Sequence, residues 1–176
     1  MKIIQKMAMA ISLVTATLVT APVAPSMAEV PPLPNTGTYF MVNLSDGQAL
    51  TASEAGLGQY VAMREFTKGG LQKWSVKRKI DLKTNKPTNR YTISLAGETA
   101  GLYFQPHPVA EMQSMLNNDA SVFVLAPVEA GFNVKSVAKN GDALRIHESP
   151  PSYTETRFAA CDGSDKFLWK FIPAEQ

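Results

Sequence analysis

The sequence predicts an all-β domain made of three similar units, each with four short strands, around a small barrel. Three observations support this prediction. Strand-like segments led by an aromatic residue recur at Tyr39, Tyr91 and Phe132. A glycine-containing turn and then a leucine follow each of these segments, as in a β-hairpin. Each unit also closes on a bulky aromatic residue in an aromatic-x-apolar pattern, so the same features recur in the same order, as in an internal repeat.

The spacings within the units agree closely. From aromatic to leucine they are 11, 11 and 12 residues, for Tyr39 to Leu50, Tyr91 to Leu102 and Phe132 to Leu144. The closing patterns, 35, 32 and 37 residues after the aromatics, are Trp74-x-Val76, Phe123-x-Leu125 and Trp169-x-Phe171. The third strands are expected in QYVAMRE, AEMQSML and TRFAACD, although the second of these also fits a helical turn. Residues at one repeat position meet around a threefold axis, so the leucines and both tryptophans are predicted to fill the core.

Three segments fall outside the strand pattern and are predicted to be loops. Val30–Thr36 is proline-rich and reads as an extended lead-in. The segment 79–90, KIDLKTNKPTNR, is expected to join the first and second units, and 147–156, HESPPSYTET, to be a proline-stiffened loop in the third.

The N-terminus has the features of a secretory signal peptide. Lys2 and Lys6 form a basic start, residues 7–19 are apolar but too short to span a bilayer, and residues 26–28 read Ser-Met-Ala, a small-x-small cleavage site. We therefore expect a signal peptide at 1–28, a lead-in at 29–36 and one domain at 37–176. The protein is expected to be exported, to a periplasm or to the medium.

Composition argues against several functions. Fifteen basic and fifteen acidic residues remain once Lys2 and Lys6 are set aside, so residues 29–176 are neutral and offer no bulk attraction to nucleic acid or membranes. Cys161 is the lone cysteine, which excludes an internal disulfide and predicts a buried core residue rather than a nucleophile. With two histidines, His107 and His147, and no catalytic or phosphate-binding motif, no enzyme activity, metal or cofactor is expected.

The first unit, GTYFMVN…DGQAL…GGLQKWSV, resembles one repeat of a β-trefoil, and the resemblance covers nearly all of residues 37–173. Two families share this layout: the mushroom (cospin-like) serine-peptidase inhibitors and the ricin-B-like lectins, whose repeats carry Gln-x-Trp. Trefoil inhibitors of cysteine peptidases are similar again. The Gln72-x-Trp74 pattern marks the shape and distinguishes weakly between these families.

The lectin resemblance implies an aspartate directly after the leucine of each unit, where it would accept hydrogen bonds from sugar hydroxyls beside a stacking aromatic. This chain has Thr51, Tyr103 and Arg145 there, and it lacks the paired cysteines that such repeats often hold. The inhibitor interpretation is therefore preferred: a monomer whose partner is a peptidase, serine rather than cysteine. Carbohydrate binding is the alternative, with Tyr39, Tyr60 or Tyr153 as a stacking platform. A toxin-accessory subunit also stays open.

Inhibition would need one exposed, pre-organised loop. The resemblance favours the segment 51–59, TASEAGLGQ, where Leu57 would suit a chymotrypsin-like pocket and Glu54 a pocket that prefers glutamate. The second candidate is the segment 79–90, where Lys83, followed by Thr84, would enter a trypsin-like pocket. The loop around the prolines at 150–151 ranks third.

Overall fold

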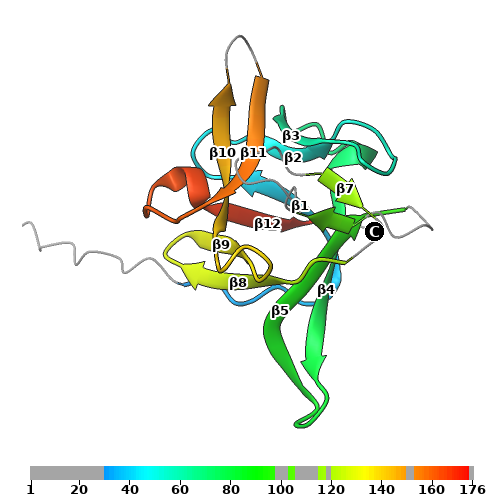
Figure 1. Cartoon of the computed structure of the whole chain (residues 1–176), viewed down its shortest axis with the longest axis vertical. Coiled ribbons are helices and arrows are strands. Elements are labelled where there is room, and N and C mark those ends of the chain that lie inside the picture. The colour runs from blue at the N-terminus through cyan, green and yellow to red at the C-terminus, as the bar shows by residue number, and fades with distance from the viewer. Residues whose placement is uncertain (1–29, 98–102, 106–114, 118–119, 150–152, 175–176) are drawn as a thin grey trace, which may run out of the picture.

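The computed structural model describes residues 30–97, 103–105, 115–117, 120–149 and 153–174. Over these ranges the protein is all-β, with a 12-stranded sheet and two short 3₁₀ helices (Figure 1). The elements in chain order are β1 (Gly37–Asn43), β2 (Ala49–Ala52), β3 (Val61–Arg64), η1 (Gly70–Gln72), β4 (Lys73–Asp81), β5 (Lys86–Leu95), β6 (Tyr103–Gln105), β7 (Met115–Asn117), β8 (Phe123–Val128), β9 (Gly131–Ser136), β10 (Ala143–Ser149), β11 (Tyr153–Ala159), η2 (Asp165–Phe167) and β12 (Trp169–Pro173).

The strands form a barrel with hairpins attached. Antiparallel pairing runs from β1 to β4, β5, β8, β9 and β12, and β12 pairs with β1 to close the ring. The remaining strands form the pairs β2–β3, β6–β7 and β10–β11, one in each unit. This is the β-trefoil arrangement, so the predicted fold class is confirmed.

The core lies where the repeats meet. Trp74, Phe123 and Trp169 are fully buried, as predicted, and so are Leu50 and Leu144, while Leu102 lies outside the described residues. The indole Nε1 of Trp74 donates to the carbonyl oxygen of Leu50 at 2.9 Å, and Trp169 repeats this bond to Leu144 at 2.9 Å. The predicted repeat register of the first and third units is therefore correct down to one hydrogen bond.

Two predicted loops are largely strand. The segment 79–90 was expected to be a linker, but β4 extends to Asp81 and β5 begins at Lys86, so the segment forms the outer half of a long hairpin. Figure 1 shows this hairpin projecting away from the barrel. The segment 147–156 likewise belongs mostly to β10 and β11, and the prolines between those strands lie outside the described residues. The segment 79–90 lacks the apolar alternation that marks a half-buried strand because its side chains are mostly exposed. The segment 147–156 lacks it because the buried residues that the structure describes there, Glu155 and Thr156, are polar.

The cysteine prediction is wrong in one respect. Cys161 is exposed and not part of the core, because it lies in the loop after β11. Its Sγ lies 3.5 Å from Asn133 Oδ1, in a long and partly buried hydrogen bond.

The proline-rich lead-in packs against the barrel. The Leu33 side chain contacts the core cluster, and the Pro34 carbonyl accepts a hydrogen bond of 2.9 Å from the hydroxyl of Tyr91. The expected signal peptide and the first part of the expected strand AEMQSML lie outside the described residues, whereas β7 covers the end of that strand. No helix in the described part of the chain has the length and apolarity that a membrane crossing requires.

Candidate functional site

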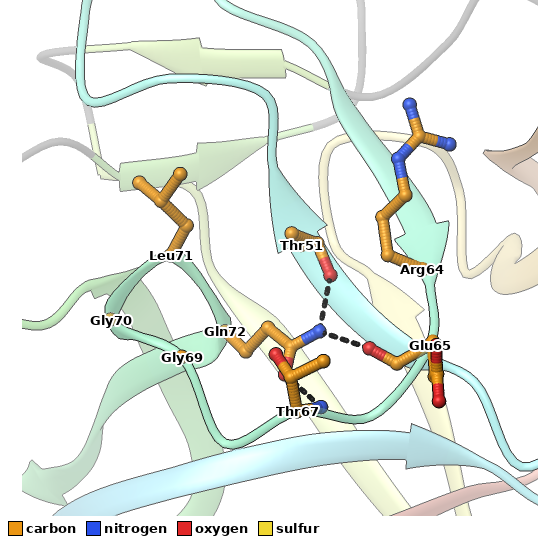
Figure 2. A pocket seen from close by; sticks show the side chains of 8 residues that line it. All are labelled: Thr51, Arg64, Glu65, Thr67, Gly69, Gly70, Leu71 and Gln72. Atoms are coloured by element: carbon orange, nitrogen blue, oxygen red, sulfur yellow. Dashed lines mark hydrogen bonds between the residues drawn. The ribbon is translucent and has the colours of Figure 1, made fainter.

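A hollow of about 370 Å³ opens beside the first Gln-x-Trp pattern. Its walls come from the end of β2, the end of β3 with the loop after it, and η1. Figure 2 shows the lining residues, which are Thr51, Arg64, Glu65, Thr67, Gly69, Gly70, Leu71 and Gln72. Its volume lies within the range of about 300–1,000 Å³ that is usual for small-molecule sites.

Gln72 holds the walls of this hollow together. Its side chain is buried, and its Nε2 donates to the Glu65 carbonyl oxygen at 2.7 Å and to Thr51 Oγ1 at 3.1 Å. Its Oε1 accepts from the Thr67 backbone N–H at 2.9 Å and from the Thr67 hydroxyl at 3.2 Å. Both amide donors and both acceptor lone pairs are thus used. Gln72 therefore positions the site and has no hydrogen-bonding capacity left for a ligand.

Thr51, unlike Gln72, has hydrogen-bonding capacity left for a ligand. Its hydroxyl donates to the Ala49 carbonyl oxygen at 2.9 Å and accepts from Gln72 Nε2, which leaves one lone pair of Oγ1 open. Arg64, across the hollow, uses Nη1 for the Met63 carbonyl at 3.2 Å and keeps further guanidinium donors in an exposed position. The hollow can thus both accept and donate hydrogen bonds.

The hollow has one apolar wall and lacks an aromatic one. The Leu71 side chain is exposed at its edge, and Figure 2 shows Leu71 and Arg64 on either side of Thr51. Phe66 lies between the lining residues Glu65 and Thr67 in the sequence but does not line the hollow. Its ring packs edge-on against Phe40, with ring centroids 5.1 Å apart. A ligand ring would therefore contact a leucine rather than stack on an aromatic face.

The third repeat has different chemistry at the same position. Phe167, the last residue of η2, takes the place of Gln72 and is buried. Arg145 takes the place of Thr51, and its Nη2 lies 3.3 Å from His147 Nδ1. Burial, together with the positive charges of Arg157 and Arg145, lowers the pKa of His147 below its usual range. Because an arginine guanidinium can only donate, His147 Nδ1 is the acceptor in this contact.

The loop predicted to be inhibitory connects β2 and β3. The Leu57 side chain is 59% exposed and Glu54 is exposed as well. The loop backbone is nonetheless fixed at one end, because the Gly58 N–H donates to the Leu116 carbonyl at 2.9 Å and the Leu116 N–H donates to the Gln59 carbonyl at 2.8 Å. The loop is therefore exposed to solvent, but backbone hydrogen bonds hold it in place at one end.

Lys83 and Thr84 lie in the turn of the β4–β5 hairpin. Both are exposed, and their backbone N–H groups donate to Asp81 Oδ1 at 2.8 and 3.3 Å. Figure 1 places this turn and the β2–β3 hairpin at opposite ends of the molecule. The two sets of predicted site residues therefore do not form one site.

The proposed stacking tyrosines differ in availability. Tyr39 is already engaged, since its ring packs edge-on against Phe171 at 6.1 Å and its hydroxyl donates to the Asn35 carbonyl at 3.0 Å. Tyr60 is exposed but does not line the hollow, and Tyr153 is the first residue of β11. The sequence had pointed to Thr51 only as the residue that replaces the lectin aspartate, which counted against a sugar site, and Arg64, Glu65 and Leu71 carry no motif and were missed.

The fold has clear counterparts among solved structures. The Rhizoctonia solani agglutinin matches with a TM-score of 0.65 and 22% identity, over 81% of this chain and 99% of the agglutinin. The Macrolepiota procera ricin B-like lectin, in complex with lactose, matches with a TM-score of 0.58 and 15% identity, over 81% and 99%. The Haemophilus ducreyi cytolethal distending toxin matches with a TM-score of 0.61 and 15% identity, over 88% and 89%.

These identities are low, so the matches establish the β-trefoil fold alone. No protein-family model matches the chain, and no curated protein matches its sequence. The resemblance to ricin-B-like lectins in layout is thus supported at the level of fold. The resemblance to mushroom-type peptidase inhibitors finds no support in these comparisons.

Proposed function

We propose that this protein is a carbohydrate-binding module and that the hollow at Thr51 takes one neutral sugar residue. The observation that carries the proposal is the Thr51 hydroxyl, which lines the hollow, is held by Gln72 and has one acceptor lone pair that no hydrogen bond within the described part of the protein uses. The similarity of the fold to an agglutinin and to a lectin solved with lactose supports the same class of function. Peptidase inhibition, the function preferred from sequence, has no such support and stays a prediction.

Three lining residues would contact the sugar in different ways. A sugar hydroxyl donates to Thr51 Oγ1, the Arg64 guanidinium donates to sugar oxygens, and the apolar face of the ring packs on Leu71. A threonine hydroxyl is a neutral acceptor, and hydrogen bonds to ionised acceptors are roughly twice as strong as neutral ones. Binding at this site is therefore expected to be weaker than at a site built around aspartate.

Because the expected affinity is low, the test starts with saturation-transfer NMR against neutral mono- and disaccharides, followed by a glycan array at high ligand density. Thr51→Val removes the hydroxyl at nearly constant volume and should abolish the signal, while Thr51→Ser keeps the hydroxyl and should retain it. Thr84→Val, in the distant hairpin turn, is the control. A glycan signal that Thr51→Val leaves unchanged would contradict the assignment of this hollow.

A peptidase panel forms the second arm. Leu57→Gly should weaken inhibition of a chymotrypsin-like enzyme if the β2–β3 loop is reactive, and Lys83→Ala should abolish inhibition of a trypsin-like enzyme if the hairpin turn is. Inhibition without any glycan signal would replace the carbohydrate proposal with the inhibitor interpretation.

A further inference from the structure

The β4–β5 hairpin carries apolar side chains at its free end. Leu82, in the turn, is 96% exposed and Ile80, at the end of β4, is 56% exposed. Figure 1 shows this end of the hairpin well away from the barrel, so no described element covers it. Single exposed apolar residues are ordinary, but two at the end of a projecting hairpin call for a physical explanation.

The same hairpin concentrates positive charge. Residues 77–90 hold six basic residues and one acidic residue, a net charge of +5. Residues 29–176 hold fifteen of each sign, so nine basic and fourteen acidic residues remain elsewhere, a net charge of −5. The neutral total therefore conceals a local concentration of positive charge in the hairpin, which the overall charge of the chain does not reveal.

The hairpin end is built as a fixed turn. Asp81 Oδ1 accepts from the backbone N–H groups of Lys83 and Thr84, and the Asp81 carbonyl accepts from the Asn85 N–H at 2.8 Å. Asn85 has a φ of 52°, a left-handed conformation that asparagine tolerates. The Asp81 carboxylate is thus used within the turn. No salt bridge joins Lys83 to an acidic side chain in the part of the chain that the structure describes.

The base of the hairpin is equally well supported. Arg78 Nε donates to the Thr88 carbonyl at 2.6 Å, and the Arg78 guanidinium lies over the Tyr91 ring, 5.9 Å from its centroid. The Thr88 hydroxyl donates to the Lys79 carbonyl at 2.8 Å across the two strands. The apolar end is therefore presented in a preformed shape, which lowers the ordering cost of any contact that it makes.

We propose that this hairpin docks on an anionic lipid surface. Leu82 and Ile80 enter the boundary between headgroups and acyl chains, and the exposed lysines behind them, Lys79, Lys83 and Lys86, lie at the level of the lipid phosphates. A convex apolar end surrounded by cations suits a fluid interface, which needs no complementary pocket.

The test is co-sedimentation with large unilamellar vesicles, made either of pure phosphatidylcholine or of phosphatidylcholine with about 30% phosphatidylglycerol, which supplies a negative surface potential. The N-terminus of the purified protein is first determined by mass spectrometry, because the apolar residues 7–19 would bind lipid themselves if retained. Binding is expected on the anionic vesicles, and it should weaken as salt is raised.

Variants then separate charge from apolar contact. Changing Lys79, Lys83 and Lys86 together to Gln should weaken binding about one hundredfold, at about fivefold for each lysine. Leu82→Gln should weaken it about tenfold, which corresponds to partial burial of one leucine. The matched controls are Leu57→Gln, an exposed leucine in another hairpin, and Lys139→Gln with Lys170→Gln, lysines outside residues 77–90; they should change binding less than twofold.

Leu82→Trp gives a local readout. Trp74 and Trp169 are fully buried and are expected to emit at short wavelength, so a tryptophan at position 82 should add a solvent-exposed signal. That signal should shift to shorter wavelength with anionic vesicles and stay unchanged with neutral ones. The absence of a shift, or equal binding by the lysine and control variants, would overturn the proposal. Binding to heparin with no response of Leu82→Trp to vesicles would also overturn it, in favour of a purely electrostatic site.

Discussion

Replacing Gln72 with methionine tests whether this side chain holds the site together. Methionine has a similar length and volume, so Gln72→Met removes four hydrogen bonds without opening a large cavity. The two hydroxyl partners, on Thr51 and Thr67, can rotate toward other acceptors or water. The Glu65 carbonyl and the Thr67 N–H cannot, and they lose their partner in a partly buried setting.

The magnitude follows from those two backbone groups. An unsatisfied buried polar group costs about 1–3 kcal/mol. Because these bonds are only partly buried, the lower half of that range applies, and the expected loss of unfolding free energy is about 2–4 kcal/mol in total. Such a loss is large for a protein of this size, since whole domains are stable by about 5–15 kcal/mol.

Urea unfolding followed by tryptophan fluorescence measures this loss, because Trp74 and Trp169 are both buried in the folded state. Gln59→Met is the matched control. Its side chain makes one exposed hydrogen bond to the Ser53 hydroxyl at 3.2 Å, so the control should lose less than about 0.5 kcal/mol. If Gln72→Met lost no more unfolding free energy than Gln59→Met, Gln72 would not hold the loop to β2. The argument that Gln72 fixes the Thr51 hydroxyl for a ligand would then fail.

Three further perturbations test the core and the third repeat. Trp74→Phe leaves the buried Leu50 carbonyl without its donor and should lower the unfolding free energy by about 1–3 kcal/mol, as measured by urea unfolding. If no loss of unfolding free energy were measured, the hydrogen bond from Trp74 to Leu50 would not stabilise the fold. Gly131→Ala would bring a Cβ to 2.9 Å from the Trp169 carbonyl oxygen, so the melting temperature should fall, by an amount equivalent to about 1–3 kcal/mol. Because burial and neighbouring arginines lower the pKa of His147, its contribution to stability is complete above its unfolded pKa of 6.5 and is lost as the pH falls below that value. The urea midpoint should therefore drop less between pH 7.5 and 5.5 in His147→Gln than in the unaltered protein. An equal drop would exclude His147 as a source of the pH dependence of stability.

The strands that the sequence predicted are those that bury a face. YFMVNL, YTISL and FNVKSV alternate or are β-branched because one side of each contacts the core, and they correspond to β1, β5 and β9. The outer halves of β4 and β5 bury neither face. Their sequence shows no period, and only the structure reveals the pairing of Ile80 with Pro87 and of Asp81 with Lys86. Periodicity records burial, so a hairpin that leaves the barrel resembles a loop in the sequence.

The candidate site was predictable only in part. From the sequence, Thr51 counted against a sugar site because it replaces an aspartate, and the Gln-x-Trp pattern marked Gln72 as part of the fold; the sequence showed no link between the two residues. That link is a single hydrogen bond across 21 positions, and it exists because η1 places Gln72 against β2. Arg64 and Leu71 join the site through the same tertiary contact, so no local pattern could have indicated them.

The first and third units share a hydrogen bond that builds the fold and differ at the position of the proposed ligand site. The tryptophan-to-leucine hydrogen bond is the same in the first and third units, with both donors fully buried. At the position of Gln72 the third unit has Phe167, a hydrocarbon that can neither hold a hydroxyl nor fix the loop by hydrogen bonds. If the first unit binds sugar as proposed, the third unit cannot offer a second copy of the same site, so it would not add the avidity that repetition of a site gives without any new contact. A projecting hairpin that brings the domain to a surface would compensate for this low valency, since attachment raises the local concentration of the ligands that the surface carries.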